Sequence, residues 1–404
     1  MTDAPNVRFL DRRTAPHTST LVLLTSLSAL AMNIFLPSLP GMTEYFHADY
    51  RLLQLSVALF LMCNALLQIA IGPISDSQGR RPVILGGILL FGLATLGCIF
   101  APTAEVFLAF RMCQAVIAVA MVLTRAAVRD LYTQDEAASK IGYITMGMAV
   151  VPMLGPAVGG FLDEHFGWQA NFWLLLALAA MAYALTYYDF GETKTRSGKS
   201  MLAQFREYPE LLRSPRFWGY TMASSFSSGA FYAYLGGAPY VGTEVFGLEP
   251  TQLGLFFGMP AIGYFAGNYL TGRFAMRVGV NLMVLWGGLL ISIGMAMSLA
   301  VSAAGFGSAQ SFFGFMVFVG LGNGLAIANG TAGALSVRPH LAGTASGLSG
   351  AIMLGGGAGL SALAGAMLSP GSGEMPLLWI MFLTGVMSVI SMLLVIRRER
   401  RLRL

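Results

Sequence analysis

Long apolar runs separated by short polar segments follow one another along almost the whole chain. Twelve such runs lie near residues 20–40, 52–72, 83–101, 105–124, 141–162, 169–188, 217–238, 252–271, 282–303, 309–331, 342–368 and 377–396. A helix of about 20 apolar residues crosses the hydrocarbon core of a bilayer. In lipid, backbone polar groups have to bond within their own segment, which favours helices for runs of this length. The pattern therefore predicts an all-α membrane protein with twelve transmembrane helices.

Composition and charge support this prediction. Of the 404 residues, 56% are hydrophobic and only 11% are charged, whereas about 25% of the residues in soluble domains are charged. All but two of the 24 Lys and Arg residues fall in segments that are cytoplasmic if the amino terminus is inside; Arg51 and Arg111 are the exceptions. This bias predicts that both termini are cytoplasmic. It also accounts for the basic composition without nucleic acid, so we expect no such partner.

The longest polar interval, residues 190–216, divides the twelve runs into six and six. We therefore expect an N-terminal six-helix half over residues 1–189, a cytoplasmic linker over 190–216 and a C-terminal six-helix half over 217–404. The apolar residues of the linker suit an interfacial helix that Pro209 would interrupt. A mobile basic linker is the alternative.

The two halves share an internal repeat. A shift of 200 positions aligns residues 153–155 with 353–355, Gly159 with Gly359, Gly72 with Gly272 and Gly79 with Gly279. One offset that serves distant sites indicates duplicated, pseudo-symmetric halves. The copies differ in charge, because Val280 and Asn281 stand opposite Arg80 and Arg81. The second copy therefore keeps the turn and lacks the charged residues at these positions.

The polar loop from Gly72 to Pro82 reads GPISDSQGRRP. Written as G-x-x-x-D-x-x-G-R-R, it resembles the loop between the second and third helices of major facilitator superfamily transporters. A carboxylate favours the positive end of a helix, and the resemblance implies that Asp76 caps the eleventh helix while the arginines pair with Asp130. The implied cytoplasmic gate comprises Gly72, Asp76, Gly79, Arg80, Arg81 and Asp130. The alternative is that the two arginines only set the membrane topology.

The fifth run contains GMAVVPMLGPAVGGFL. Proline removes a backbone hydrogen bond and bends a helix, and small residues let neighbouring helices approach closely. The pattern resembles the antiporter motif of drug-exporting major facilitator proteins, with Gly147, Gly155, Pro156, Gly159 and Gly160 in the motif. Bending and close packing between the halves are the expected roles, and ordinary glycine-mediated packing is part of the same expectation.

Arg111 lies within the fourth run, where a charge costs about 2.5 to 3.5 kcal/mol on insertion scales. The surrounding FLAFRMCQ resembles the fourth-helix motif of proton-coupled family members, although Ala115 stands where the family commonly has Gly. The resemblance implies a role for Arg111 in managing the proton. A purely structural, snorkelled Arg is the alternative.

The first run narrows the resemblance to the Bcr/CflA group of drug exporters. Relatives commonly show an aspartate followed by M-Y-L-P-A-L-P, and this chain has Asn33 followed by I-F-L-P-S-L-P. Asn cannot take up a proton near neutral pH, so the usual coupling carboxylate is absent at this position. No Asp or Glu lies in the middle of any predicted span. Proton antiport is therefore implied by the family and only partly supported by the residues.

A substrate cavity is expected between the halves, lined by apolar side chains with a few hydrogen-bonding groups. The candidates are Asn33, Arg111, Gln114, Phe231, Tyr232, Tyr234, Asn268 and Asn323. Asn33 and Arg111, at similar depth on the first and fourth runs, are expected to face the same cavity. For each single aromatic residue, core packing or lipid contact is the alternative.

Together these features predict a monomeric secondary transporter of the bacterial inner membrane. It would export small amphiphilic drugs or metabolites by proton antiport, rocking its two halves about the cavity. The proton gradient would supply the energy, and no cofactor or metal is expected. The four histidines lie outside the runs and no nucleophile, base and metal set is present, so we do not expect an enzyme.

Two other functions remain open. The first is a proton-coupled uptake symporter of the same fold for a sugar or an organic ion, which would favour more polar and charged residues in the spans. The second is a receptor or channel, which would need a sensing domain or a polar stripe along a pore. The antiporter motif of the fifth run counts against the symporter, and the chain has no polar segment longer than the central linker.

Overall fold

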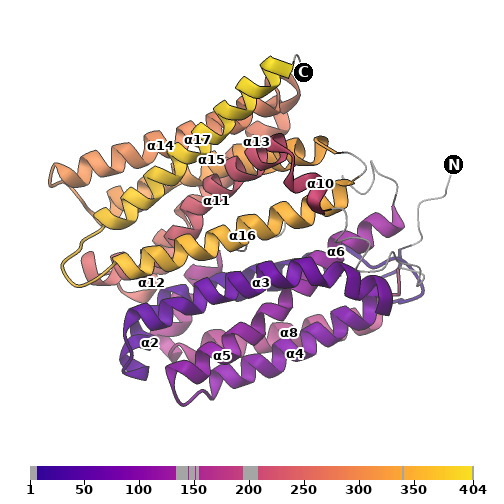
Figure 1. The fold of residues 1–404 in the computed structure, drawn as a ribbon. Helices are drawn as coiled ribbons and strands as arrows, with labels where there is room; N and C mark the ends of the chain where they lie inside the picture. Colours follow the sequence, from indigo (N-terminus) through magenta and orange to yellow (C-terminus); the bar gives the residue numbers. More distant parts are fainter. Residues whose placement is uncertain are drawn as a thin grey trace.

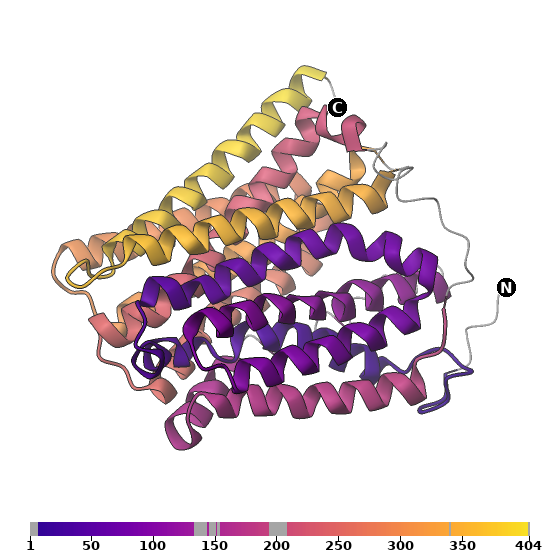
Figure 2. The same ribbon diagram turned by 60° about the horizontal axis from the view of Figure 1, so that its bottom comes forward.

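The computed structural model describes residues 7–132, 144, 151, 154–193, 208–338 and 341–402. This part is built of helices joined by short loops (Figure 1). The helices up to α8 lie together as a first group, and those from α11 to α17 lie beside them as a second group (Figures 1 and 2). Both chain termini lie toward one end of the molecule, which we call the terminal end. The opposite end is the far end.

The first group contains the helices that form from the N-terminal apolar runs. They are α1 (Thr18–Asn33), η1 (Leu36–Ser38), α2 (Leu39–Phe46), α3 (Tyr50–Gln78), α4 (Arg80–Ile99), α5 (Ala104–Gln114), η2 (Ala115–Ile117), α6 (Ala118–Leu131), the helical residues 154–166 and α8 (Gln169–Asp189). The first apolar run is interrupted near Pro37 and Pro40, because proline supplies no backbone N–H to the preceding turn.

The second group contains the helices that form from the C-terminal apolar runs, and one short helix precedes them. They are α10 (Tyr208–Leu212), α11 (Pro215–Tyr240), the π-helical turn η3 (Val241–Val245), α12 (Pro250–Phe257), α13 (Met259–Val278), α14 (Val280–Ala303), α15 (Ala309–Ser336), α16 (Ala342–Met367) and α17 (Met375–Leu402). The short helix α10 lies in the predicted linker, most of which falls outside the described residues.

Among the described residues, nine helices are long and apolar enough to cross a membrane. They coincide with nine of the twelve predicted runs. Of the other three, the run 217–238 forms α11, the run 252–271 forms α12 and α13, and half of the run 141–162 lies outside the described residues. The membrane-protein class is therefore confirmed, and the total of twelve spans stays a prediction.

Two turns that the repeat predicted have the same backbone conformation. Gly79, between α3 and α4, has φ 101° and ψ 156°, and Gly279, between α13 and α14, has φ 87° and ψ 151°. L side chains rarely adopt this conformation, so glycine is required at both turns. The shift of 200 positions thus corresponds to a repeated local structure at these turns.

The apolar core joins the two groups. One continuous cluster of buried side chains includes Ile34 and Leu53 from the first group and Leu253 and Leu378 from the second. A smaller cluster around Phe217 lies within the second group. Apolar burial therefore holds the groups together without filling the whole space between them.

Candidate functional site

A cavity of about 780 Å³ lies between the two groups of helices. Its walls come from α1, α3 and α6 on one side and from α11, α13, α15 and α16 on the other. Small-molecule sites have volumes of about 300 to 1,000 Å³ and combine apolar walls with a few polar groups. This cavity does so with Phe60, Phe231, Tyr232, Tyr264, Asn33, Asn64, Gln68 and Asn323.

The cavity reaches the terminal end of the bundle and stops short of the far end. Its lining includes Arg80, where α4 begins, and Leu341, just before α16. Toward the far end, Gln54 Nε2 of α3 donates to the backbone O of Ser361 on α16 at 2.6 Å and lies 3.0 Å from its Oγ. These contacts bridge the two groups beyond the cavity.

The helical residues 154–166 help to close the far end. A Cβ at Gly160 would clash with the backbone O of Pro250 on α12, and a Cβ at Gly159 would clash with the backbone O of Ile34. Small residues let helix backbones approach this closely. Both motif glycines therefore lie at close helix contacts. The contact of Gly160 is between the two groups, and the contact of Gly159 is within the first group. Gly155 and Pro156 lie on the same helical segment, and Gly147 lies outside the described residues.

The structure divides the eight predicted cavity residues into two sets. Four line the cavity, namely Asn33, Phe231, Tyr232 and Asn323. The other four, Arg111, Gln114, Tyr234 and Asn268, do not line it. Helical position in the sequence could not separate the sets, because it gives the depth of a residue and leaves the rotation of its helix undetermined.

Arg111 lies one side chain away from the cavity. Its side chain is fully buried and its guanidinium carbon lies 4.4 Å from the ring centroid of Phe35 and 4.1 Å from that of Phe60. Its Nη1 donates to Gln114 Oε1 at 2.7 Å and its Nη2 to the backbone O of Ala31 at 2.7 Å. Phe60 also lines the cavity. Arg111 is thus held by aromatic faces and neutral acceptors, and does not snorkel.

The other three predicted cavity residues that do not line the cavity have hydrogen-bond partners within the protein. Gln114 Nε2 donates to Thr95 Oγ1 at 2.7 Å. Tyr234 is fully buried, and its hydroxyl donates to the backbone O of Phe257 at 3.3 Å. Asn268 Nδ2 donates to the backbone O of Tyr264, four residues earlier on α13, at 2.8 Å. These polar groups are satisfied locally, and the residues do not line the cavity.

The predicted gate contains a polar network at the terminal end of the first group. Arg80 Nε forms an ion pair with Asp130 Oδ2 at 3.1 Å, and its Nη1 donates to Ser75 Oγ. Arg81 Nε donates to the backbone O of Phe190 at 2.9 Å. Gly72 lines the cavity, and the side chain of Asp76 lies outside the described residues. The capping of the eleventh helix by Asp76 therefore stays a prediction.

Glu192 is a member of this network that the sequence pattern did not indicate. Its Oε1 accepts from the backbone N of Arg80 at 2.8 Å, and its Oε2 accepts from the backbone N of Arg81 at 3.2 Å. A carboxylate is favourable at the N-terminus of a helix. A Cβ at Gly79 would clash with the same carboxylate. Glu192 thus joins the chain after α8 to the start of α4.

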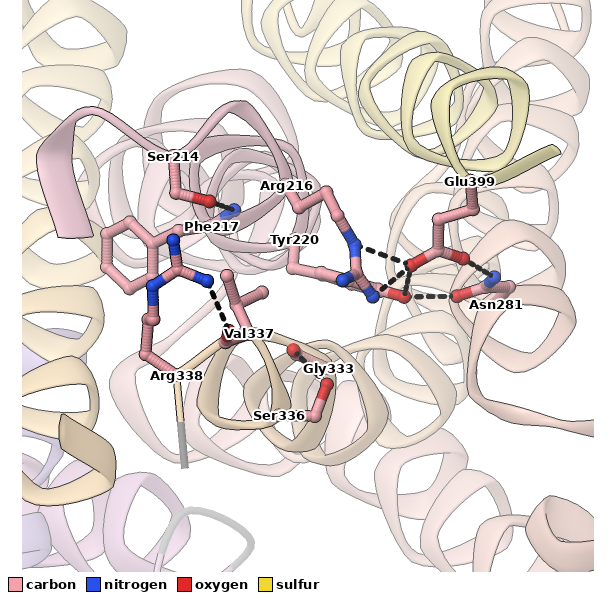
Figure 3. A network of polar contacts seen from close by, with 10 residues as sticks. All are labelled: Ser214, Arg216, Phe217, Tyr220, Asn281, Gly333, Ser336, Val337, Arg338 and Glu399. Carbon is pink, nitrogen blue, oxygen red and sulfur yellow. Dashed lines mark hydrogen bonds and ion pairs between the residues drawn. The ribbon is translucent and has the colours of Figure 1, made fainter. Parts of the chain in front are cut away.

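A second polar cluster, also absent from the sequence expectations, lies at the terminal end of the second group. Figure 3 shows Arg216, Tyr220 and Asn281 around the carboxylate of Glu399. Arg216 Nη2 donates to Glu399 Oε1 at 2.6 Å and Asn281 Nδ2 to its Oε2 at 2.6 Å, while the Tyr220 hydroxyl donates to Oε1 at 2.9 Å. In the sequence Glu399 is surrounded by arginines, as in a solvated tail.

The second copy lacks the charges of the loop after Gly72, as its sequence shows, but this cluster supplies a charged contact nearby that the repeat did not predict. Asn281 corresponds to Arg81 under the shift of 200 positions. It contacts the carboxylate of Glu399, much as the start of α4 contacts that of Glu192. The charged partner of Glu399 in this cluster is Arg216, which lies on α11. The two groups therefore each bind a carboxylate where the helix after the glycine turn begins.

Comparisons with known proteins identify relatives that are membrane transporters. A family model described as the Major Facilitator Superfamily matches residues 21–360. The chain is 32% identical to the chloramphenicol resistance protein of Pseudomonas aeruginosa, over 81% of this chain and 78% of that protein. It is 28% identical to the bicyclomycin resistance protein homolog of Haemophilus influenzae, over 93% and 94%. It is also 28% identical to multidrug resistance protein D of Escherichia coli, over 92% and 94%.

Solved structures share the fold at low identity. The peptide transporter POT in complex with alafosfalin has a TM-score of 0.77 at 12% identity, covering 95% of this chain and 94% of that one. A bacterial homolog of the human lysosomal transporter Spinster, in an inward-facing and unoccupied conformation, has a TM-score of 0.70 at 18% identity, covering 95% and 96%. Since the family model matches most of the chain, the protein belongs to the Major Facilitator Superfamily.

Proposed function

We propose that this protein exports small amphiphilic drugs or metabolites from the bacterial cytoplasm by proton antiport. It acts as a monomer in the inner membrane, with both termini cytoplasmic and with two six-helix halves that rock about a central cavity. The observation that carries the proposal is the cavity between the two groups of helices, which extends to the terminal end and is closed toward the far end.

The contacts at the far end suit a gate that opens in each cycle. Tyr50 Oη donates to the backbone O of Gly236 at 3.1 Å, and Gln54 donates to Ser361. These are hydrogen bonds between neutral groups, each worth about 0.5 to 1.5 kcal/mol net. Breaking them costs little enough for a reversible step. With the terminal end in the cytoplasm, this arrangement corresponds to the inward-facing state.

The relatives support export over uptake. Proteins named for bicyclomycin, chloramphenicol and multidrug resistance match this chain over most of its length. The close contact at Gly160 lies in the motif that resembles the antiporter motif. Proton coupling is supported by family membership and by Arg111, whereas Asn33 cannot itself carry the proton.

The test is export from a bacterial host stripped of its own drug pumps. Expression of the chain should raise tolerance to several amphiphilic antimicrobials and lower their accumulation in the cell. Collapse of the proton gradient should abolish this effect. If tolerance persists after the gradient is collapsed, the protein is an exporter but not a proton antiporter. Raised accumulation, or sensitivity to every compound in the panel, would favour the uptake symporter.

A further inference from the structure

Among the described residues, the charged side chains that line the cavity are basic. In the part of the chain that the structure describes, the charged side chains that line the cavity are Arg80 and Arg125, and no Asp or Glu lines it. The sequence adds that no acid lies in the middle of any apolar run. Arg80 is paired with Asp130, which is not part of the lining. The described wall of the cavity therefore offers no carboxylate as a counter-charge to a bound cation.

This charge pattern bears on the substrate. A cation that leaves water for an apolar cavity loses its hydration, and the loss is severe unless an opposite charge or hydrogen bonds replace it. An uncharged molecule pays no such penalty. The cavity thus favours uncharged molecules over cations of equal size.

Asn33 supplies the complementary observation. It is 1% exposed, lines the cavity, and neither its Nδ2 nor its Oδ1 has a hydrogen-bond partner in the described structure. Buried polar side chains nearly always have a partner, so an orphaned amide in a cavity wall calls for an explanation. A side-chain amide both donates and accepts. A ligand with an amide, or with a carbonyl and a hydroxyl, would satisfy both atoms.

Three other amide side chains in the wall each have one polar atom engaged. Gln68 Nε2 donates to Asn64 Oδ1 at 3.0 Å, and Asn323 Oδ1 accepts from Ser227 Oγ at 2.9 Å. Thr221, on α11 of the second group, also lines the cavity and has no partner for its Oγ1 in the described structure. Asn33 on α1 and Thr221 thus present unused hydrogen-bonding groups from the two sides of the cavity.

We propose that the cavity binds uncharged amphiphiles carrying an amide, carbonyl or hydroxyl, that Asn33 binds this polar group, and that lipophilic cations are excluded. This inference rests on the proposed export function and names its substrate class. It distinguishes uncharged amphiphiles from lipophilic cations, two classes of drug-sized compound that a pump without such selectivity would export equally.

Binding to the purified full-length protein tests the inference directly. Chloramphenicol and thiamphenicol, which are uncharged and carry amide and hydroxyl groups, should bind at least tenfold more tightly than the lipophilic cation tetraphenylphosphonium. Asn33→Leu should weaken chloramphenicol binding at least tenfold while the melting temperature stays within a few degrees. Unchanged chloramphenicol binding by Asn33→Leu would overturn the role of Asn33.

A charge swap supplies the second arm. Asn33→Asp places a carboxylate in the cavity wall and should raise tetraphenylphosphonium binding at least tenfold. Asn329→Asp makes the same change on α15 at a buried residue that does not line the cavity, and should give no such gain. An equal gain in both variants would overturn the argument from cavity charge.

The outcomes also separate this inference from the export function. If the wild-type protein exports tetraphenylphosphonium as well as chloramphenicol, export stands and the selectivity is overturned. If it binds the uncharged probes but exports neither, the selectivity stands and the export function falls. If it binds neither uncharged probe, the assignment of the substrate class is overturned.

Discussion

Gln54 of α3 and Ser361 of α16 join the two groups of helices at the far end, with Gln54 Nε2 2.6 Å from the backbone O of Ser361 and 3.0 Å from its Oγ. Both residues are almost fully buried. The glutamine amide therefore bridges the groups in a place where water cannot readily replace it. Another hydrogen bond between the groups, from Tyr50 Oη to the backbone O of Gly236, is longer at 3.1 Å. The Gln54–Ser361 pair is therefore a direct way to bias the transport cycle.

Gln54→Leu should shift the protein toward states that are open at the far end. Loss of the bridge removes about 0.5 to 1.5 kcal/mol, which corresponds to a two- to tenfold change in the ratio of states. Spin labels at Arg51 on α3 and at Ser369 after α16 would report the change as a larger population at long distances.

Ser361→Ala is the matched control for this prediction. It removes the hydroxyl contact but keeps the backbone O that accepts the shorter hydrogen bond. Its effect on the distance distribution should therefore be smaller. Equal shifts in the two variants would argue against the backbone hydrogen bond as the main restraint.

Gly79→Ala should destabilise the protein more than Gly279→Ala. Both glycines have a positive φ, so both substitutions carry backbone strain of about 1 to 3 kcal/mol. Only at Gly79 would the added Cβ also clash with the carboxylate of Glu192, since no atom lies within 4 Å of a Cβ at Gly279. Melting temperatures in detergent would measure the difference. The double variant Gly79→Ala with Glu192→Ala should recover the part of the lost melting temperature that is due to the clash. It also loses the hydrogen bonds of Glu192.

Arg111→Lys should lower both transport and stability. A lysine ammonium lacks the planar fork that reaches Gln114 and Ala31 while lying between two aromatic rings. A buried acceptor left without a donor costs about 1 to 3 kcal/mol. Transport of a proven substrate should fall by tenfold or more, with a lower melting temperature.

Arg51→Lys is the matched control for Arg111, because Arg51 is exposed at the start of α3. It should leave transport and melting temperature unchanged. Wild-type transport by Arg111→Ala would remove the case for a functional role of this residue.

Glu399→Gln should destabilise the second group. The carboxylate accepts hydrogen bonds from Arg216, Tyr220 and Asn281. A hydrogen bond to a charged group contributes about 1.5 to 3 kcal/mol to stability. A glutamine retains one acceptor oxygen and removes the charge. The melting temperature in detergent should fall by several degrees.

An exposed pair at the terminal end provides the comparison. Glu210 Oε1 lies 2.8 Å from Arg338 Nε, and the side chains are 48% and 46% exposed, against 11% for Glu399 and 25% for Arg216. Exposed ion pairs contribute about 0 to 1 kcal/mol. Glu210→Gln should therefore change the melting temperature little. Equal losses in the two variants would contradict the importance of burial.

Within the site, the sequence predicted the local geometry and the contacts that follow from a local pattern. The glycine turn at Gly79 needs only a backbone conformation, and the family-like loop places Arg80 near Asp130, where the structure has an ion pair. It failed where orientation decides. Phe60 and Asn64 line the cavity four residues apart on α3, and that spacing was the one available signal, shared with many other apolar helical faces.

The sequence alone determined that this chain is an all-helical membrane protein, because apolar length and the distribution of Lys and Arg act locally and need no knowledge of neighbours. It also determined the repeated turns at Gly79 and Gly279. Only the tertiary structure decided that Arg111 lies behind Phe60, that Glu399 is buried in a polar cluster and that Asn33 faces the cavity without a partner. The physical reason is that the rotation of each helix about its axis is set by packing against helices distant in the sequence, and this rotation decides which side chains meet.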